Sequence, residues 1–280
     1  MTTLLKILAF AIVAVNLQCN IGNYNTVKGE GEVIEKEFKL SEFNEASFGN
    51  GWDVKLIQSN NNRLIVKANE NLVDILKIEQ DDLYLKVGTE SKDNIGKADA
   101  KLLTVYYAEN LKTLKASSGV ELYSPNQLEF RDVKISSSSG SSVELNVKTD
   151  KLDCSSSSGS QMMLKISSTR VEASSSSGSE LELAGKSKSI IASSSSGSEL
   201  KLSGYTETLE ADSSSGSDID SSELKAVNVT ANASSGSNID VYPIEVLDAK
   251  CSSGGRVTYH NTPSVDIRKN ESSGGRVRAN

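Results

Sequence analysis

The sequence has little of what most enzymes and nucleic-acid-binding proteins use. It contains one histidine, three cysteines, three prolines and only 5% aromatic residues among its 280 residues. So few histidines and cysteines make no zinc ligand set, and one histidine offers only one imidazole base to activate a serine nucleophile. The net charge of −7 argues against nucleic acid as a partner, because binding phosphates requires a basic face.

The first apolar run is too short to cross a bilayer, which needs about 20 residues. The chain begins MTTLLKILAFAIVAVNLQCN, with Lys6 before an apolar run at 7–15 and Cys19 shortly after it. This pattern predicts a secretory signal peptide over residues 1–19. The cysteine suggests a bacterial lipoprotein that is cut before Cys19 and acylated on it. The alternative is an ordinary signal peptide in which Cys19 is incidental.

Serine runs that look like flexible linkers recur at a nearly constant spacing. A glycine follows the serines in each copy, and successive glycines are 18 to 21 residues apart, most often 19. Linkers have no reason to keep a period, whereas stacked structural units do. The marker glycines are Gly119, Gly140, Gly159, Gly178, Gly197, Gly216, Gly236, Gly254 and Gly274.

Apolar and polar residues alternate around each glycine, as they do in strands with one buried face. In one copy, Val171, Ala173 and Leu181 lie at odd distances from Gly178, whereas Glu172 and Glu180 lie at even distances. A single unit cannot bury its apolar face, but parallel stacking on the next unit can. We therefore predict an all-β fold, a parallel β-helix over residues 111–280 with ~19-residue rungs.

The serines then acquire a structural role. In each run of four we expect two to point inward and two outward, with inward hydroxyls bonding along the stack or to carbonyls at the bend. Cys154 is expected to fill a core position that alanine takes elsewhere. Cys251 lies five rungs away, about 24 Å at 4.8 Å per rung, so we predict no disulfide between them.

The N-terminal part is less regular. Residues 20–36 are rich in Asn, Gly and Glu and are predicted to be a tether. Residues 37–110 are predicted to be β-rich, either as a small domain or as a cap on the solenoid. Within them, alternation favours strands at 53–58 and 63–68, turns at SNNN and EQDD, and one helical turn in NENLVDIL.

The candidate sites are sparse, and we predict no catalytic residue, cofactor or metal. His260 lies in YHNTP and is expected to be an exposed loop residue. Glu199, Asp218 and Asp220 could hold Ca²⁺, but the favoured interpretation is a solvated acidic face that keeps the rod soluble. Positive charge at the last rungs is expected to protect an open edge or to contact an anionic ligand; the residues are Arg256, Arg276 and Arg278.

The order of these features resembles a known family. The chain is similar to the auto-transporter adhesin head GIN domain family (DUF2807) in three stretches. They are FNEASFGNGWDVKLIQSNNNRLIVKANENLVDIL, the SSGS and SSGG rungs, and the closing CSSGGRVTYHNTPSVDIRKNESSGGRVR. The resemblance covers residues 37–280. It implies a β-helix-like all-β fold in an exported protein of Bacteroidetes-type bacteria, often a lipoprotein, and it implies no catalytic residues.

These observations predict a non-enzymatic envelope protein, periplasmic or on the outer membrane, anchored through Cys19. Its role would be structural, adhesive or ligand-binding, with a glycan or another envelope protein as partner and no nucleic acid. Two alternatives stay open: a carbohydrate-active β-helix enzyme and a Ca²⁺-stabilised binding module. Two or three clustered acids beside a base in a groove would favour the enzyme.

Overall fold

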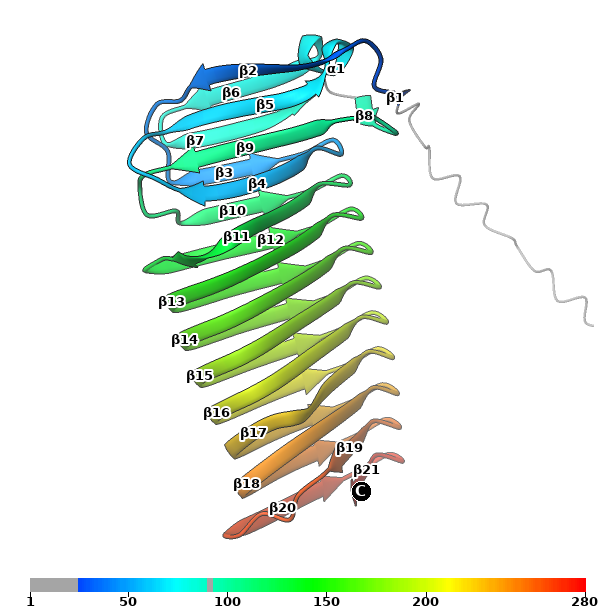
Figure 1. Ribbon diagram of the computed structural model, residues 1–280. Helices are drawn as coiled ribbons and strands as arrows, with labels where there is room; N and C mark the ends of the chain where they lie inside the picture. Colours follow the sequence, from blue (N-terminus) through cyan, green and yellow to red (C-terminus); the bar gives the residue numbers. More distant parts are fainter. Residues whose placement is uncertain (1–24, 90–92) are drawn as a thin grey trace, which may run out of the picture.

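The protein forms an elongated stack of β-rungs closed at one end by a β-rich cap (Figure 1). The computed structural model describes residues 25–89 and 93–280. Within them, nineteen strands form one continuous sheet, and two short strands form a second. The prediction of an all-β parallel solenoid is confirmed.

The cap contains nine strands and one short helix. They are β1 (Asn25–Val27), β2 (Val33–Lys39), β3 (Glu45–Phe48), β4 (Asp53–Gln58), β5 (Arg63–Asn69), α1 (Glu70–Asp74), β6 (Leu76–Asp81), β7 (Tyr84–Thr89), β8 (Asp93–Ile95) and β9 (Lys101–Tyr107). The solenoid strands are β10 (Thr113–Ala116), β11 (Glu121–Glu129), β12 (Asp132–Ser137), β13 (Ser142–Ser156), β14 (Gln161–Ser175), β15 (Glu180–Ser194), β16 (Glu199–Ser213), β17 (Asp218–Ala233), β18 (Asn238–Cys251), β19 (Arg256–Tyr259), β20 (Asp266–Glu271) and β21 (Arg276–Ala279).

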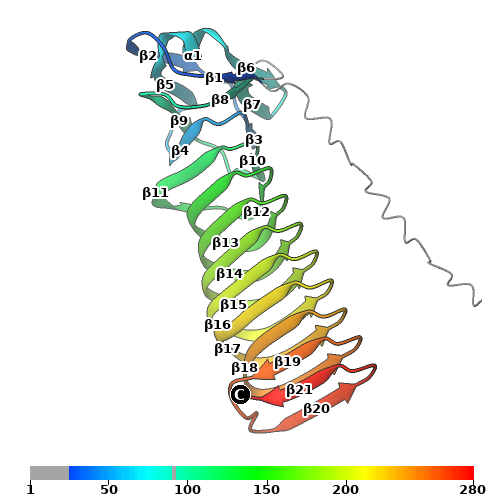
Figure 2. The same cartoon turned by 90° about the vertical axis from the view of Figure 1, so that its right-hand side faces the viewer.

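Each rung has two walls, as the view along the side of the stack shows (Figure 2). The pre-turn wall consists of the residues that lead into a serine–glycine turn, and the post-turn wall consists of those that follow it. A long strand such as β14 supplies the post-turn wall after one turn and the pre-turn wall before the next turn, because it bends between the two walls. Stacking is parallel and in register, so that Val171 pairs with Ile190 and Leu181 with Leu200.

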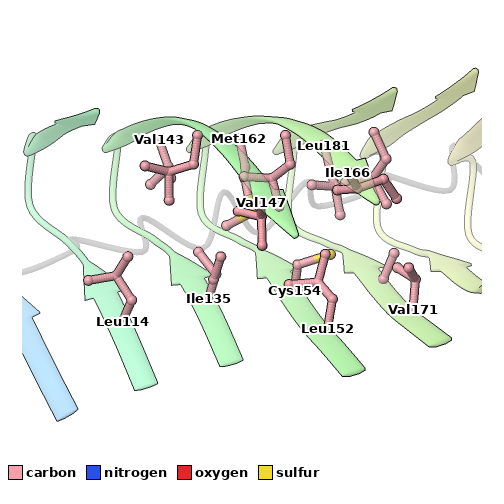
Figure 3. Close-up of a cluster of buried hydrophobic side chains, with 14 of the residues drawn as sticks. Leu114, Ile135, Val143, Val147, Leu152, Cys154, Met162, Ile166, Val171 and Leu181 are labelled. Atoms are coloured by element: carbon pink, nitrogen blue, oxygen red, sulfur yellow. The ribbon is translucent and has the colours of Figure 1, made fainter. Parts of the chain in front are cut away.

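The core is the space between the walls. Leu114, Ile135, Leu152 and Val171 from the pre-turn wall face Val143, Met162 and Leu181 from the post-turn wall (Figure 3). All are 3% exposed or less. Cys154 is fully buried and pairs with Ala173 of the next rung. The prediction that it fills an alanine position is confirmed.

The serine–glycine turn reverses the chain within four residues. In one copy Ser177 and Gly178 have φ of 55° and 68°, and Ser179 N donates to Ser176 O at 3.3 Å. Two positive φ angles in the centre define a type I′ turn. The Gly178 N–H then donates to Ser196 O of the following rung at 3.2 Å. The turns therefore stack on one another through their own backbone.

The corner opposite this turn absorbs the variation in rung length. Pairing of β16 with β17 slips by one residue between Lys201 and Ser203, which accounts for a 20-residue rung. Further register shifts occur at the same corner between β11 and β13 and between β17 and β18. Every turn keeps its four residues, so irregular spacing of the glycines does not disturb the walls.

The cap continues the solenoid and then changes strand direction. Strands β3 and β4 stack in parallel on β10 and β11, and Asn50 and Gly51 form their turn with φ of 67° and 82°. Strands β7 and β9 add another parallel layer. Antiparallel β5, β2 and β6 complete this end, and α1 buries Leu72 and Val73 against it. One sheet thus joins the cap and the repeats.

Two predictions for this region are wrong. Residues 20–36 were expected to be a tether, but β1 pairs with β8 and β2 pairs along its whole length with β5. Ile34 and Phe38 of β2 pack against the core, which the high polar content of the segment obscures. SNNN does not close a hairpin, because β9 lies between β4 and β5 and pairs with both. A hairpin turn lies at the end of EQDD, at Asp82 and Leu83, and the helical turn is confirmed.

Two glycines of one rung predict very different sensitivity to alanine. A Cβ at Gly204 would lie 1.9 Å from Gly185 O, whereas a Cβ at Gly197 meets nothing within 4 Å. Gly197→Ala should lower the free energy of unfolding by about 1 kcal/mol, from its positive φ alone. Gly204→Ala should lower it by about 3 kcal/mol or more, because the rungs must separate. Urea unfolding midpoints measure both, and equal effects would contradict the assignment.

Single-residue deletions test where register is set. Deleting Ser222, the extra residue at the variable corner, restores a 19-residue rung and should leave the cooperative unfolding transition within about 1 kcal/mol of wild type. Deleting Ser215 removes a turn residue and turns the side chains that follow it to the wrong face. We expect that variant to be insoluble or to lose its unfolding transition. A tolerated Ser215 deletion would show that the turn does not set the register.

Candidate ligand-binding groove

The serines divide differently from the expected two inward and two outward. In the run before Gly178, only Ser175 is buried, Ser174 and Ser177 are exposed and Ser176 is half-buried. The second buried hydroxyl belongs to Ser179, after the glycine. The strand alternation stops at the turn, where positive φ at Ser177 directs its side chain outward. The expected two-and-two division is therefore wrong.

The buried serines satisfy the polar groups of the turn. Ser175 Oγ and Ser179 Oγ are 3.0 Å apart, and Ser179 Oγ is 2.8 Å from Ser156 O of the preceding rung. Ser176 N donates to Ser179 Oγ at 3.1 Å. The hydroxyls therefore bond to each other within a turn and to a carbonyl of the preceding rung. Their role is structural, because a buried polar group without a partner is costly.

A second hydroxyl ladder lies at the opposite corner, and the sequence analysis missed it. Thr206 Oγ1 is fully buried and lies 3.3 Å from Lys188 O of the preceding rung and 3.0 Å from Thr208 O. Equivalent bonds are made by residues at the same ninth position after the glycine, namely Thr149, Ser168 and Ser187. That constant offset was the available signal.

The outward serines help to line a groove along the pre-turn wall. It has a volume of about 540 Å³ and runs across strands β14 to β18 and β20. The column four residues before each glycine is polar throughout the groove. Its members are Ser174, Ser193, Asp212, Asn232, Lys250 and Asn270. Six rungs at a spacing of 4.8 Å make this column about 24 Å long. The groove thus offers a regular row of donors and acceptors.

The post-turn wall carries the acidic columns, and a lysine pairs with two of their carboxylates. Lys201 Nζ lies 2.9 Å from Glu180 Oε1 and 3.2 Å from Glu199 Oε1. Hydrogen bonds to these carboxylates raise the pKa of Lys201 above its usual range, and Glu180 has the larger effect.

The three residues considered for Ca²⁺ have separate partners. Glu199 pairs with Lys201, Asp218 accepts from Asn238 at 2.7 Å, and Asp220 accepts from Ser222 at 2.6 Å. In residues 25–89 and 93–280, no group of three or more His, Cys, Asp or Glu side chains is arranged to hold a metal.

His260 is not the exposed loop residue that was expected. Its side chain is 25% exposed, and Nε2 lies 2.9 Å from Asp240 Oδ1. Asn280 Nδ2 is 3.1 Å from His260 Nδ1. The preceding rung and the chain end thus both hold the ring, which sequence spacing could not reveal. In the part of the chain that the structure describes, no serine hydroxyl bonds to this imidazole, so the arrangement is not a nucleophile–base pair.

The two described cysteines are free thiols in different core columns. Burial raises the pKa of both Cys154 and Cys251, so neither is an activated nucleophile. Cys251 takes the position of the buried serine before the turn and contributes to the groove lining. Cys19, the predicted lipidation site, lies outside the described residues.

Two basic residues of the last rungs lie in one column. Arg256 pairs with Arg276 in the register of β19 and β21, and Arg278 pairs with Thr258. Edge protection remains a prediction for them. Among the described residues, no helix is long and apolar enough to cross a membrane.

The sequence matches one known protein family. The family profile described as "Putative auto-transporter adhesin, head GIN domain" matches residues 42–185 and 164–263. Among curated proteins, none matches the sequence.

Similar crystal structures come from two Parabacteroides species. A "putative lipid binding protein" from Parabacteroides distasonis aligns with a TM-score of 0.70 at 20% identity, covering 91% of this chain and 100% of that one. A "putative adhesin" from Parabacteroides merdae aligns with a TM-score of 0.69 at 20% identity, covering 91% and 99%. At such identity the structures show a shared fold. The family profile spans well over half of the sequence, and the chain therefore belongs to the auto-transporter adhesin head GIN domain family.

Proposed function

We propose that this protein is a non-enzymatic, lipid-anchored envelope protein that binds an extended neutral glycan along the serine groove. The observation that carries the proposal is the groove itself, which is open, polar and repeated over six rungs. Sugar hydroxyls need many donors and acceptors in a regular row, and the column from Ser174 to Asn270 supplies them. The adhesin-like family supports an exported, ligand-binding role.

The groove lacks the arrangement that would favour a glycosidase or lyase. Asp212 is its one lining carboxylate, and it accepts a hydrogen bond from Asn232 Nδ2 at 2.8 Å. Glycoside hydrolysis uses two carboxylates facing one bond. The acidic columns that could supply such a pair lie on the other wall. Binding without chemistry is the function that this geometry favours.

Anchoring follows from the N-terminal sequence. A short apolar run behind Lys6 and a cysteine just after it are typical of exported lipoproteins. Acylation of Cys19 would tether the cap end of the stack, because the first described strand, β1, begins only six residues later. The groove lies in rungs further from that end.

Filling the groove should weaken glycan binding. Ser193 points outward in the groove, and Ser193→Tyr places a ring across it. We expect binding of linear neutral hexasaccharides, measured by titration calorimetry on the chain without residues 1–18, to weaken at least about tenfold because donors and acceptors are covered.

The matched control is Gln161→Tyr, an exposed outward position on the post-turn wall. It should leave both binding and the melting temperature unchanged. If none of cellohexaose, xylohexaose and mannohexaose binds the wild-type protein, or if both variants bind equally well, the groove is not a neutral glycan site.

Lipidation should depend on one cysteine. We expect metabolic labelling with an alkyne palmitate to mark the wild-type protein and Cys154→Ala but not Cys19→Ala, because Cys154 is buried and follows no signal sequence. In-gel fluorescence after click coupling measures the label. Equal labelling of wild type and Cys19→Ala would reject the anchor.

A further inference from the structure

A second hollow lies on the outer face of the pre-turn wall, between the groove and the cap. It has a volume of about 410 Å³ and is formed by three successive rungs, at the starts of β10 and β12 and within β13. We call it the basic hollow. Its lining residues are Asn110, Lys112, Arg131, Asp132, Val133, Lys134, Lys151 and Asp153.

The charge of the basic hollow is opposite to that of the protein. Four cations and two carboxylates line it, whereas the whole chain carries a net charge of −7. Here the excess of positive charge is gathered around a concave surface, where fields from several groups add.

Two of the four cations form ion pairs with neighbouring carboxylates. Lys134 Nζ lies 3.0 Å from Asp153 Oδ2, and Lys151 Nζ lies 3.4 Å from Glu172 Oε1. Glu172 lies outside the hollow and also pairs with Arg170. These pairs hold the lysine side chains on the wall and leave their charge partly compensated.

The other two cations have no such partner. Lys112 and Arg131 are exposed, and within residues 25–89 and 93–280 neither side chain forms an ion pair or hydrogen bond. They come from adjacent rungs, since Lys112 precedes β10 and Arg131 precedes β12. The remaining carboxylate, Asp132, follows Arg131 and lowers the net charge without closing the hollow.

We propose that the basic hollow binds the carboxylate of an acidic saccharide, with Lys112 and Arg131 as its direct ligands. The planar guanidinium suits bidentate binding of a carboxylate, and the ammonium adds a point charge beside it. A volume of about 410 Å³ far exceeds a bare oxyanion and falls in the range that holds a small organic ligand. Asn110 and Asp132 provide polar contacts for sugar hydroxyls. This site is separate from the neutral glycan groove and does not depend on it.

The test uses trigalacturonate as the probe and galactotriose as its neutral counterpart. Calorimetry on the chain without residues 1–18 should show trigalacturonate binding that weakens as salt rises from about 50 to 200 mM, because exposed charges are screened. Lys112→Gln with Arg131→Gln should weaken it at least about tenfold, as expected for loss of charge-assisted hydrogen bonds. Galactotriose should not bind at the hollow.

The control removes the same charge elsewhere. Lys186→Gln with Lys188→Gln changes two exposed lysines at the bend of β15 and should leave trigalacturonate binding within about twofold of wild type, since these charges are remote and screened. Melting temperatures confirm that both double variants fold.

Each remaining outcome overturns the proposal. Equal loss in the two double variants indicates non-specific attraction. Unchanged binding in the Lys112 and Arg131 variant excludes the hollow, and equal binding of galactotriose excludes the carboxylate. If inorganic phosphate binds with loss in the hollow variant while trigalacturonate does not, the site takes a small oxyanion and not a saccharide. Ser193→Tyr should not affect trigalacturonate, so failure of the groove proposal is distinguishable.

Discussion

Parallel, in-register stacking of the serine–glycine turns is the constraint on which the solenoid depends. Each turn places two residues at positive φ, and each marker-glycine N–H from Gly119 to Gly254 bonds to the turn of the next rung. The walls on either side inherit their register from this contact. Rung length can vary only at the opposite corner, where β17 carries an extra residue without moving Val229 or Ala231 out of the core.

The same stacking turns every position of the repeat into a column of like chemistry. Inside, the columns allow small and large side chains to alternate between the walls and bring hydroxyls to the places where backbone groups need partners. Outside, identical charges would meet at 4.8 Å. The structure relieves this in two ways. Lys134 is followed by Asp153 in the same column, and Lys201, from the column next to Glu180 and Glu199, pairs with both of them.

The two walls consequently differ in what they can bind. The post-turn wall carries acids paired with Lys201 or bonded to neighbouring amides and hydroxyls. The pre-turn wall carries the hydroxyl-rich groove and, nearer the cap, the basic hollow with the uncompensated Lys112 and Arg131. Both proposed sites therefore lie on one face of the stack. An extended ligand on that face would follow the columns, because each column places side chains in a straight line along the stack.

The sequence by itself determined the repeat, the parallel β-helix and the inward positions, because a period of 19 and a strand alternation of two are properties of local order. It also placed Cys154 in the core. It did not determine which serines are buried, since positive φ at residues such as Ser177 interrupts the alternation at the turn. Nor did it place β2 on β5, or join Asp240, His260 and Asn280. Only the tertiary structure decided these contacts and assembled the groove and the hollow, because both depend on which residues of different rungs become neighbours.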